Sequence, residues 1–505
     1  MDTVQESKSS TSKANSGATP IPDAELAKGE VGIADPLGMP MKRKFNILSI
    51  IAVGYNISNS WVAIAASFAI AIQSGGALSL LYGIIVVSFA MLCTGGTLAE
   101  LASVYPTAGG QYHFTSILAP RQWSRGLSYF GGLAAIFSWI CLGASISLSG
   151  TNALMAIVIR WQPAYQPQSW HYFLVYQLFN ILVVIYNTYL ANKTLWMYNI
   201  GFVLSISTFV VITVACPACS EVHVNSNEIR GMMINGSGWS DGVSFLTGLS
   251  TPQFMLSGLD ATLHLAEECL DPERVGFLTA FPFAIAIIYS YRDVAESLST
   301  KTGFPIYFIW ERATHSSAAA TVFMASLFVI SCVTFNAVHQ TASRLTWSFA
   351  RDDALFFSNK LSSIHSSLGV PVYALVLDGI LVFLVGIVYV CSSTAFNSFI
   401  STTVIVAQIS YAIPALLAIL RRRSIRFLPE NRPFKVPNVV GYICNVVCII
   451  WAIILTVFFC FPTASPVTGR NMNYASVVLV VVLIIGVANW FGYARGHYHG
   501  PRLEM

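Results

Sequence analysis

One stretch of the chain combines the start of a membrane helix with residues that can do chemistry. It reads FMLSGLDATLHLAEE, from Phe254 to Glu268, and places Ser257, Gly258 and Asp260 inside an apolar run. An unpaired carboxylate in hydrocarbon is costly, so Asp260 is a candidate functional residue. Beside a cavity it can face a substrate ammonium group or take part in proton coupling. The alternative is that it caps an unwound piece of helix.

A second polar cluster interrupts the first apolar run. It reads NISNSW, from Asn56 to Trp61, and Ser and Asn side chains compete with helical hydrogen bonds. Irregular backbone at membrane depth is permitted only where it is buried in protein or lines a cavity. We therefore predict two broken helices that share a substrate site. The alternative is that these side chains only bond to neighbouring helices.

The candidate substrate-binding residues come from three runs. An aromatic ring can cover an ammonium group, so Trp139 is added to the candidates. The alternative is that this ring only packs against neighbouring helices. The candidates are Ser58, Asn59, Ser60, Trp61, Trp139, Ser257, Gly258, Leu259 and Asp260.

Composition places these residues in a membrane protein. Of the 505 residues, 55% are hydrophobic and 10% are charged, whereas a soluble protein carries about 25% charged residues. A helix needs ~20 apolar residues to cross a bilayer. Such runs fall near 46–72, 77–104, 127–157, 171–190, 195–216, 244–265, 317–340, 371–391, 396–420, 437–461 and 474–494, with a shorter one at 276–291.

Basic residues decide whether the short run spans. If it does, the main Lys and Arg clusters, including Arg421–Arg423, fall on one side. The positive-inside rule then predicts ~12 spans with both termini cytoplasmic. This topology explains the basic residues, so no nucleic-acid partner is expected. We predict polar cytosolic tails at 1–44 and 496–505 around one membrane domain at 45–495, which the repeats and the family resemblance described below identify as a transporter domain.

The two interrupted spans stand five spans apart, as in transporters built from inverted repeats. We predict all-α repeats at about 45–216 and 244–420, with extra helices at 437–494. Half-helix N-terminal ends carry positive partial charge and free N–H groups that suit a carboxylate.

Four segments resemble one known family. The segment AELASVYPTAGGQYHFTSILAP, Ala99–Pro120, is similar to the signature of fungal permeases of the amino acid/choline transporter family, within the amino acid–polyamine–organocation superfamily. GYNISNSW at 54–61, GLDATLHLAEE at 258–268 and RLTWSFARDDAL at 344–355 also resemble it. The resemblance implies a LeuT-type fold and secondary transport by alternating access at the plasma membrane. Amino acids, 4-aminobutyrate, choline or related bases are the implied substrates, with a proton as co-substrate.

Further residues are candidates for gating and modification. The family resemblance suggests that Glu100 pairs across a cytoplasmic gate with Arg344 or Arg351, and a solvated interfacial Glu is the alternative. His264 is read as an exit-path or gate residue. Asn235 begins the sequon NGS, a glycosylation acceptor if that loop lies outside.

Other functional classes lack support in the sequence. It contains no HExxH or P-loop, so we expect no enzyme, metal or cofactor. A carrier or exporter for a specialised-metabolite intermediate or an alkaloid-like amine remains an alternative, and a transporter-like sensor is a weaker one. One departure from the family is that the chain passes from Arg274 straight to Val275, where the resemblance implies a further Pro-containing stretch before the seventh span. The short run at 276–291 then indicates either a thinned bilayer with a helix extended by flanking residues or missing coding sequence.

Overall fold

The computed structural model describes residues 47–105, 107, 109–194, 196–221, 235–261, 272–290, 296–391, 393–462, 464–469 and 471–501. Residues 45–501 cluster as one compact unit. The described residues are mostly helical, and the β-pairing found among them is an isolated bridge between Ser74 and Asn235. The predicted tail at 1–44 and His264 lie outside the described residues.

Ten segments of the described chain are long and apolar enough to cross a membrane. A polar interruption divides the first of them into two helices. The helices of these segments are α1 (Ile47–Ser58) and α2 (Ser60–Gln73), α3 (Gly76–Val104), α5 (Arg121–Trp161), α6 (Ser169–Tyr189), α7 (Trp196–Cys219), α14 (Ser317–Arg351), α16 (Val372–Cys391), α17 (Ser393–Leu420), α18 (Asn438–Phe458) and α19 (Ala475–Asn489).

The regions predicted as the sixth and seventh spans are built from shorter pieces. The sixth begins with α9 (Asp241–Gly248) and α10 (Ser250–Met255). The seventh is α12 (Pro272–Ser290), in which Phe281–Ser290 forms a shorter apolar helical segment. The all-α membrane architecture is thus confirmed, while the count of twelve spans and the inverted repeat stay predictions.

Shorter elements cover the ends of the long helices. They are α4 (Gln111–Leu118), η1 (Ala191–Lys193), η2 (Glu296–Ser299), α13 (Pro305–Thr314), α15 (Ser358–Leu361), η3 (Trp490–Ala494) and α20 (Arg495–His497).

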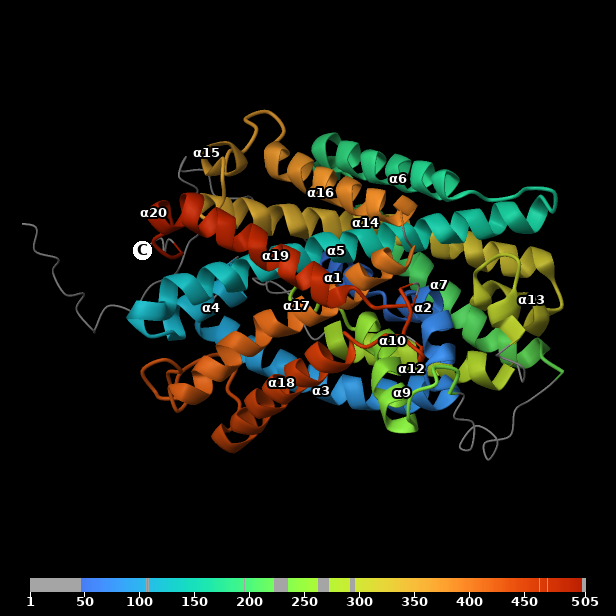
Figure 1. Cartoon of the computed structure of the whole chain (residues 1–505), viewed down its shortest axis with the longest axis horizontal. Helices are drawn as coiled ribbons and strands as arrows, with labels where there is room; N and C mark the ends of the chain where they lie inside the picture. Colours follow the sequence, from blue (N-terminus) through green and yellow to red (C-terminus); the bar gives the residue numbers. More distant parts are fainter. Residues whose placement is uncertain are drawn as a thin grey trace, which may run out of the picture. The chain divides into compact units, whose positions relative to one another are not determined.

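Burial separates central from peripheral helices. Figure 1 shows α5 and α14 between the pair α6 and α16 on one side and the pair α3 and α18 on the other. In α5, 83% of the apolar window is buried, against 22% in α7 and in the span that contains α19. Exposed Leu, Ile and Val side chains lie along α6, α7 and α19. A water-soluble surface would not carry such continuous apolar faces, so these helices face lipid.

Candidate functional site

The first span breaks at Asn59, where the backbone leaves the helical region with φ 24° and ψ 58°. The break is held by Ser205 of α7, a residue that the sequence analysis did not select. The Ser205 hydroxyl donates to Asn59 Oδ1 at 3.0 Å and accepts the Trp61 indole N–H at 2.9 Å. Ser205 therefore fixes the side chains on both sides of the break.

Asn56 holds the same break against two neighbouring helices. Its Nδ2 donates to the carbonyl of Tyr198 in α7 at 2.7 Å. Its own carbonyl accepts the hydroxyl of Thr334 in α14 at 2.8 Å. Side chains thus satisfy backbone groups on both sides, as membrane-depth irregularity requires.

The sixth region is interrupted after α10 by a turn over Leu256–Asp260. Gly258 has φ +83°, a left-handed conformation that glycine adopts without the steric penalty of a side chain. A Cβ atom at Gly258 would lie 3.0 Å from Ile57 Cγ2, so the two breaks touch. One turn earlier, α10 is tied to α2 by the Thr251 hydroxyl, which donates to the Ser67 carbonyl at 3.0 Å.

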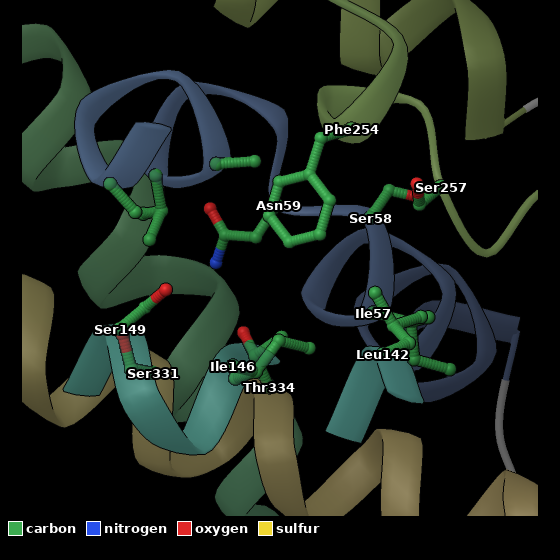
Figure 2. A pocket seen from close by; sticks show the side chains of 13 residues that line it. Ile57, Ser58, Asn59, Leu142, Ile146, Ser149, Phe254, Ser257, Ser331 and Thr334 are labelled. Carbon is green, nitrogen blue, oxygen red and sulfur yellow. The ribbon is translucent and has the colours of Figure 1, made fainter. Parts of the chain in front are cut away.

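A small pocket lies where the two breaks meet. Figure 2 shows Phe254 and Ser257 in the upper part of the view and the hydroxyls of Ser149, Ser331 and Thr334 below. The lining consists of apolar side chains of mixed size together with hydroxyl and amide groups. It comprises Ile57, Ser58, Asn59, Val62, Ala63, Ala66, Leu142, Ile146, Ser149, Phe254, Ser257, Ser331 and Thr334.

Three predicted residues, Ser58, Asn59 and Ser257, line this pocket. Sequence reasoning missed its three hydroxyls from α5 and α14, because each is a lone Ser or Thr in an apolar helix. The other six predicted residues do not line it, namely Ser60, Trp61, Trp139, Gly258, Leu259 and Asp260. Trp61 is buried beside Phe283, with ring centroids 5.4 Å apart, and points to α7.

Among the described residues, three side chains donate to the carboxylate of Asp260, a residue that is 3% exposed. Tyr411 of α17 donates to Oδ1 at 2.8 Å. Gln111 of α4 and Trp139 of α5 donate to Oδ2 at 2.8 and 3.1 Å. Trp139 thus bonds to Asp260 in this structure rather than facing the pocket.

Some polar atoms near the first break have no hydrogen-bond partner in the described part of the chain. They include Asn59 Nδ2, Asn56 Oδ1 and the Ser60 hydroxyl. Asn59 belongs to the pocket lining. A buried donor without a partner is costly, so its amide nitrogen is suited to a ligand oxygen or to water.

The pairing predicted for Glu100 is wrong. Glu100 Oε2 lies 2.5 Å from Arg423 and Oε1 lies 2.6 Å from Arg432. Arg344 and Arg351 are both on α14, whereas the segment that follows α17 lies against the end of α3. The reason is tertiary: burial of Glu100 requires nearby cations, and the 421–437 segment supplies them.

The remaining features are the predicted glycosylation acceptor Asn235 and the capacity of the described residues to bind a metal ion. Asn235 lies in a turn, where its Nδ2 donates to the Trp239 carbonyl at 2.7 Å and to Asp241 at 2.9 Å. Glycosylation there stays a prediction. Within the described residues, no group of three or more His, Cys, Asp or Glu side chains could hold a metal ion.

Comparison with known proteins agrees with this geometry. A family model described as amino acid permease matches residues 45–484. The chain belongs to the amino acid permease family. It is therefore a multi-pass integral membrane transporter and not an enzyme, and the resemblance seen in its sequence is confirmed.

Named relatives carry different cargoes. The chain is 32% identical to a choline transporter of Saccharomyces cerevisiae over 475 residues, covering 91% of this chain and 83% of the relative. It is 30% identical to a swainsonine transporter of Arthroderma benhamiae over 474 residues, covering 91% and 92%. It is 25% identical to a 7-keto 8-aminopelargonic acid transporter of S. cerevisiae over 546 residues, covering 92% and 95%.

Proposed function

We propose that this permease moves a small amine-bearing solute, such as an amino acid, 4-aminobutyrate, choline or a related base, by alternating access coupled to protons. The observation that carries the proposal is the pocket between the two helix breaks, lined by Asn59, Ser257 and the α5 and α14 hydroxyls. The named relatives support the substrate class, since each is named for a solute that contains an amine or ammonium nitrogen.

The pocket offers different chemistry at its two broken helices. At the start of α2, the first amide N–H groups have no partner within the helix and carry positive partial charge. With Asn59 Nδ2 they suit a carboxylate or hydroxyl group of a substrate. The carbonyls at the end of α10, together with Ser257 and the ring of Phe254, suit an ammonium group.

The test is uptake in permease-deficient yeast. Radiolabelled amino acids, 4-aminobutyrate and choline are supplied at acid and neutral pH, with Asp260→Asn and Asn59→Ala alongside the wild type. We expect uptake of one solute class, stronger at acid pH and lost in Asp260→Asn although that variant reaches the membrane. No uptake of any solute by correctly placed wild-type protein would overturn the proposal.

A second candidate is a carrier for an alkaloid-like amine of a specialised pathway. It is favoured by the 30% identity to the swainsonine transporter over nearly the whole of both chains. Adding unlabelled swainsonine to the uptake assay separates this candidate function from the first one. Competition at micromolar concentration would favour this candidate, and no competition against choline or amino acid uptake would reject it.

We further propose a plasma-membrane location with both termini cytoplasmic, on the basis of the positive-inside distribution of Lys and Arg. Asn235 then lies outside and can carry a glycan. Epitope tags at the two termini should be labelled only after permeabilisation, and Asn235→Gln should remove any glycosidase-sensitive shift in mobility. Tag labelling in intact cells would contradict the orientation.

A further inference from the structure

Two motifs that stand far apart in the sequence meet at one carboxylate. Gln111 belongs to the signature Ala99–Pro120, and Asp260 belongs to the turn that follows α10. Their side chains are joined by the 2.8 Å bond from Gln111 Nε2 to Asp260 Oδ2. The signature is therefore connected directly to the broken sixth region.

The local sequence explains how Gln111 reaches this position. Gly110 has φ 55° and ψ −123°, a conformation that favours glycine and turns the chain into α4. Gln111 is the first residue of α4 and is fully buried. Because α4 packs against α5 and α17, the donors on Gln111, Trp139 and Tyr411 come from three elements that converge on Asp260.

The three donors match a carboxylate. An indole and the nitrogen of a primary amide donate only, and the Tyr411 hydroxyl is able to donate to Oδ1. Hydrogen bonds to a charged group are stronger than neutral ones. Gln111 Oε1 has no partner among the described residues, so donation to Asp260 is what fixes the orientation of its amide. The opposite orientation would place an oxygen against the carboxylate.

Asp260 stands three residues after Ser257, which lines the pocket, and the residues between them include Gly258 in its left-handed conformation. Fixing the carboxylate therefore restrains the short turn that presents Ser257. We propose that Gln111, Trp139 and Tyr411 are positioning residues that hold the 257–260 turn in its substrate-binding shape. This inference rests on the proposed function, because the turn lines the proposed substrate pocket.

The first test removes one donor at a time while keeping shape. Gln111→Met and Tyr411→Phe should each raise KM for uptake by about tenfold, the scale expected for loss of a hydrogen bond to a charged group. The maximal rate per transporter at the membrane should stay within about twofold of the wild-type rate. Each substitution removes one hydrogen bond to the Asp260 carboxylate and leaves the rest of the fold intact. Tyr176→Phe is the matched control, since this buried hydroxyl donates to the Val382 carbonyl between α6 and α16.

The second test asks whether the donors act through Asp260. Because Asp260→Asn is expected to lose uptake, the readout on that background is the rate at which a thiol reagent labels Ser257→Cys. Gln111→Met and Tyr411→Phe should change this rate little further, because the acceptor that they hold is already altered. A purely structural role would lower the amount of transporter at the membrane and leave KM unchanged. Additive increases in the labelling rate on both backgrounds would overturn the positioning role.

A measurement without substrate separates this inference from the proposed function. Ser257→Cys reports on the turn through its rate of labelling by a thiol reagent, after subtraction of labelling in the parent chain. Gln111→Met and Tyr411→Phe should speed that labelling several-fold, whereas Tyr176→Phe should not. If labelling speeds up but wild type takes up no solute, the proposed function fails and the inference stands. If the wild type transports a solute but Gln111→Met and Tyr411→Phe change neither the labelling rate nor KM, the positioning inference fails and the proposed function stands.

Discussion

The Glu100 carboxylate lies 2.5 Å from the guanidinium of Arg423, although 323 positions separate the two residues in the chain. Arg432 donates to the other carboxylate oxygen at 2.6 and 3.0 Å, and the backbone N–H of Val436 donates to the same oxygen at 3.3 Å. Glu100 is 2% exposed and both guanidinium groups are buried. This triad fastens the end of α3 to the segment between α17 and α18.

Breaking the triad should destabilise the protein. Glu100→Gln leaves two buried cations without their counter-charge, and removal of one partner from a buried ion pair costs about 3–5 kcal/mol. We expect a lower unfolding temperature in detergent and less transporter at the membrane. Glu430→Gln, at an exposed position in the segment between α17 and α18, is the control and should leave both unchanged. Equal unfolding temperatures for Glu100→Gln and wild type would refute the prediction.

A methyl group at Gly441 should break the same triad from the other side. A Cβ atom there would lie 2.2 Å from Arg423 Nη2, so the guanidinium would have to move. Gly441→Ala should therefore lower the unfolding temperature, and in combination with Glu100→Gln its effect should be less than additive. Gly126→Ala is the control, because nothing lies within 4 Å of a Cβ atom at that helical position. Full additivity would show that the two sites are independent.

The Arg160–Glu311 pair should make stability depend on pH. Hydrogen bonds from Arg160 lower the pKa of the Glu311 carboxyl, and the Ser317 hydroxyl adds to the effect. A lowered folded-state pKa gives stability that is present above the unfolded value of about 4.3 and is lost as pH falls through the folded value.

The unfolding temperature of the wild type should therefore decline below about pH 4.5, and Glu311→Gln should flatten that part of the curve. The difference should be small, because Arg160 is 37% exposed and solvent screens the pair. Thermal unfolding in detergent between pH 7 and pH 3.5 measures it. If the unfolding temperatures of the wild type and Glu311→Gln change with pH in the same way, the Arg160–Glu311 pair does not contribute to the pH dependence of stability.

Tyr498 anchors the C-terminal end of the described chain. Its ring is fully buried, its hydroxyl bonds to that of Ser128 at 2.6 Å, and Arg125 donates to its carbonyl at 2.9 Å. Tyr498→Phe should cost about 1 kcal/mol through one lost hydrogen bond, whereas Tyr498→Ala should cost about 3–5 kcal/mol through a cavity. His499→Ala, at an exposed neighbour, should cost nothing. Thermal unfolding of the three variants in detergent tests this order, and equal losses in all three would contradict the anchor.

Ser205 should matter for transport although it does not line the pocket. Ser205→Ala removes the partner of both Asn59 Oδ1 and the Trp61 indole, so Asn59 loses the contact that orients it in the pocket. We expect KM for uptake to rise by about fivefold or more, the scale of one to two lost buried hydrogen bonds. Ser145→Ala, whose hydroxyl bonds only within α5 to the Cys141 carbonyl, is the control. An unchanged KM in Ser205→Ala would show that Asn59 is oriented by other contacts.

Local chemistry explains which features were readable in the sequence. Hydropathy over a window reveals membrane helices because every exposed backbone group must be satisfied in lipid. The break at Asn59 follows from Ser and Asn side chains that compete with helical bonds, and the turn at Gly258 follows from the conformational freedom of glycine. The family, the membrane architecture and three pocket residues came from such local signals.

Only the tertiary structure decided which groups meet. A buried Glu100 must have cationic partners, but nothing near it in the chain tells Arg423 and Arg432 from Arg344 and Arg351, since the choice depends on how the segment after α17 folds back. In the same way, Asp260 required polar partners, and the packing of α4, α5 and α17 supplied Gln111, Trp139 and Tyr411. A hydrogen bond forms only between groups about 3 Å apart. The sequence states that a polar group in an apolar helix needs a partner, and the fold selects it.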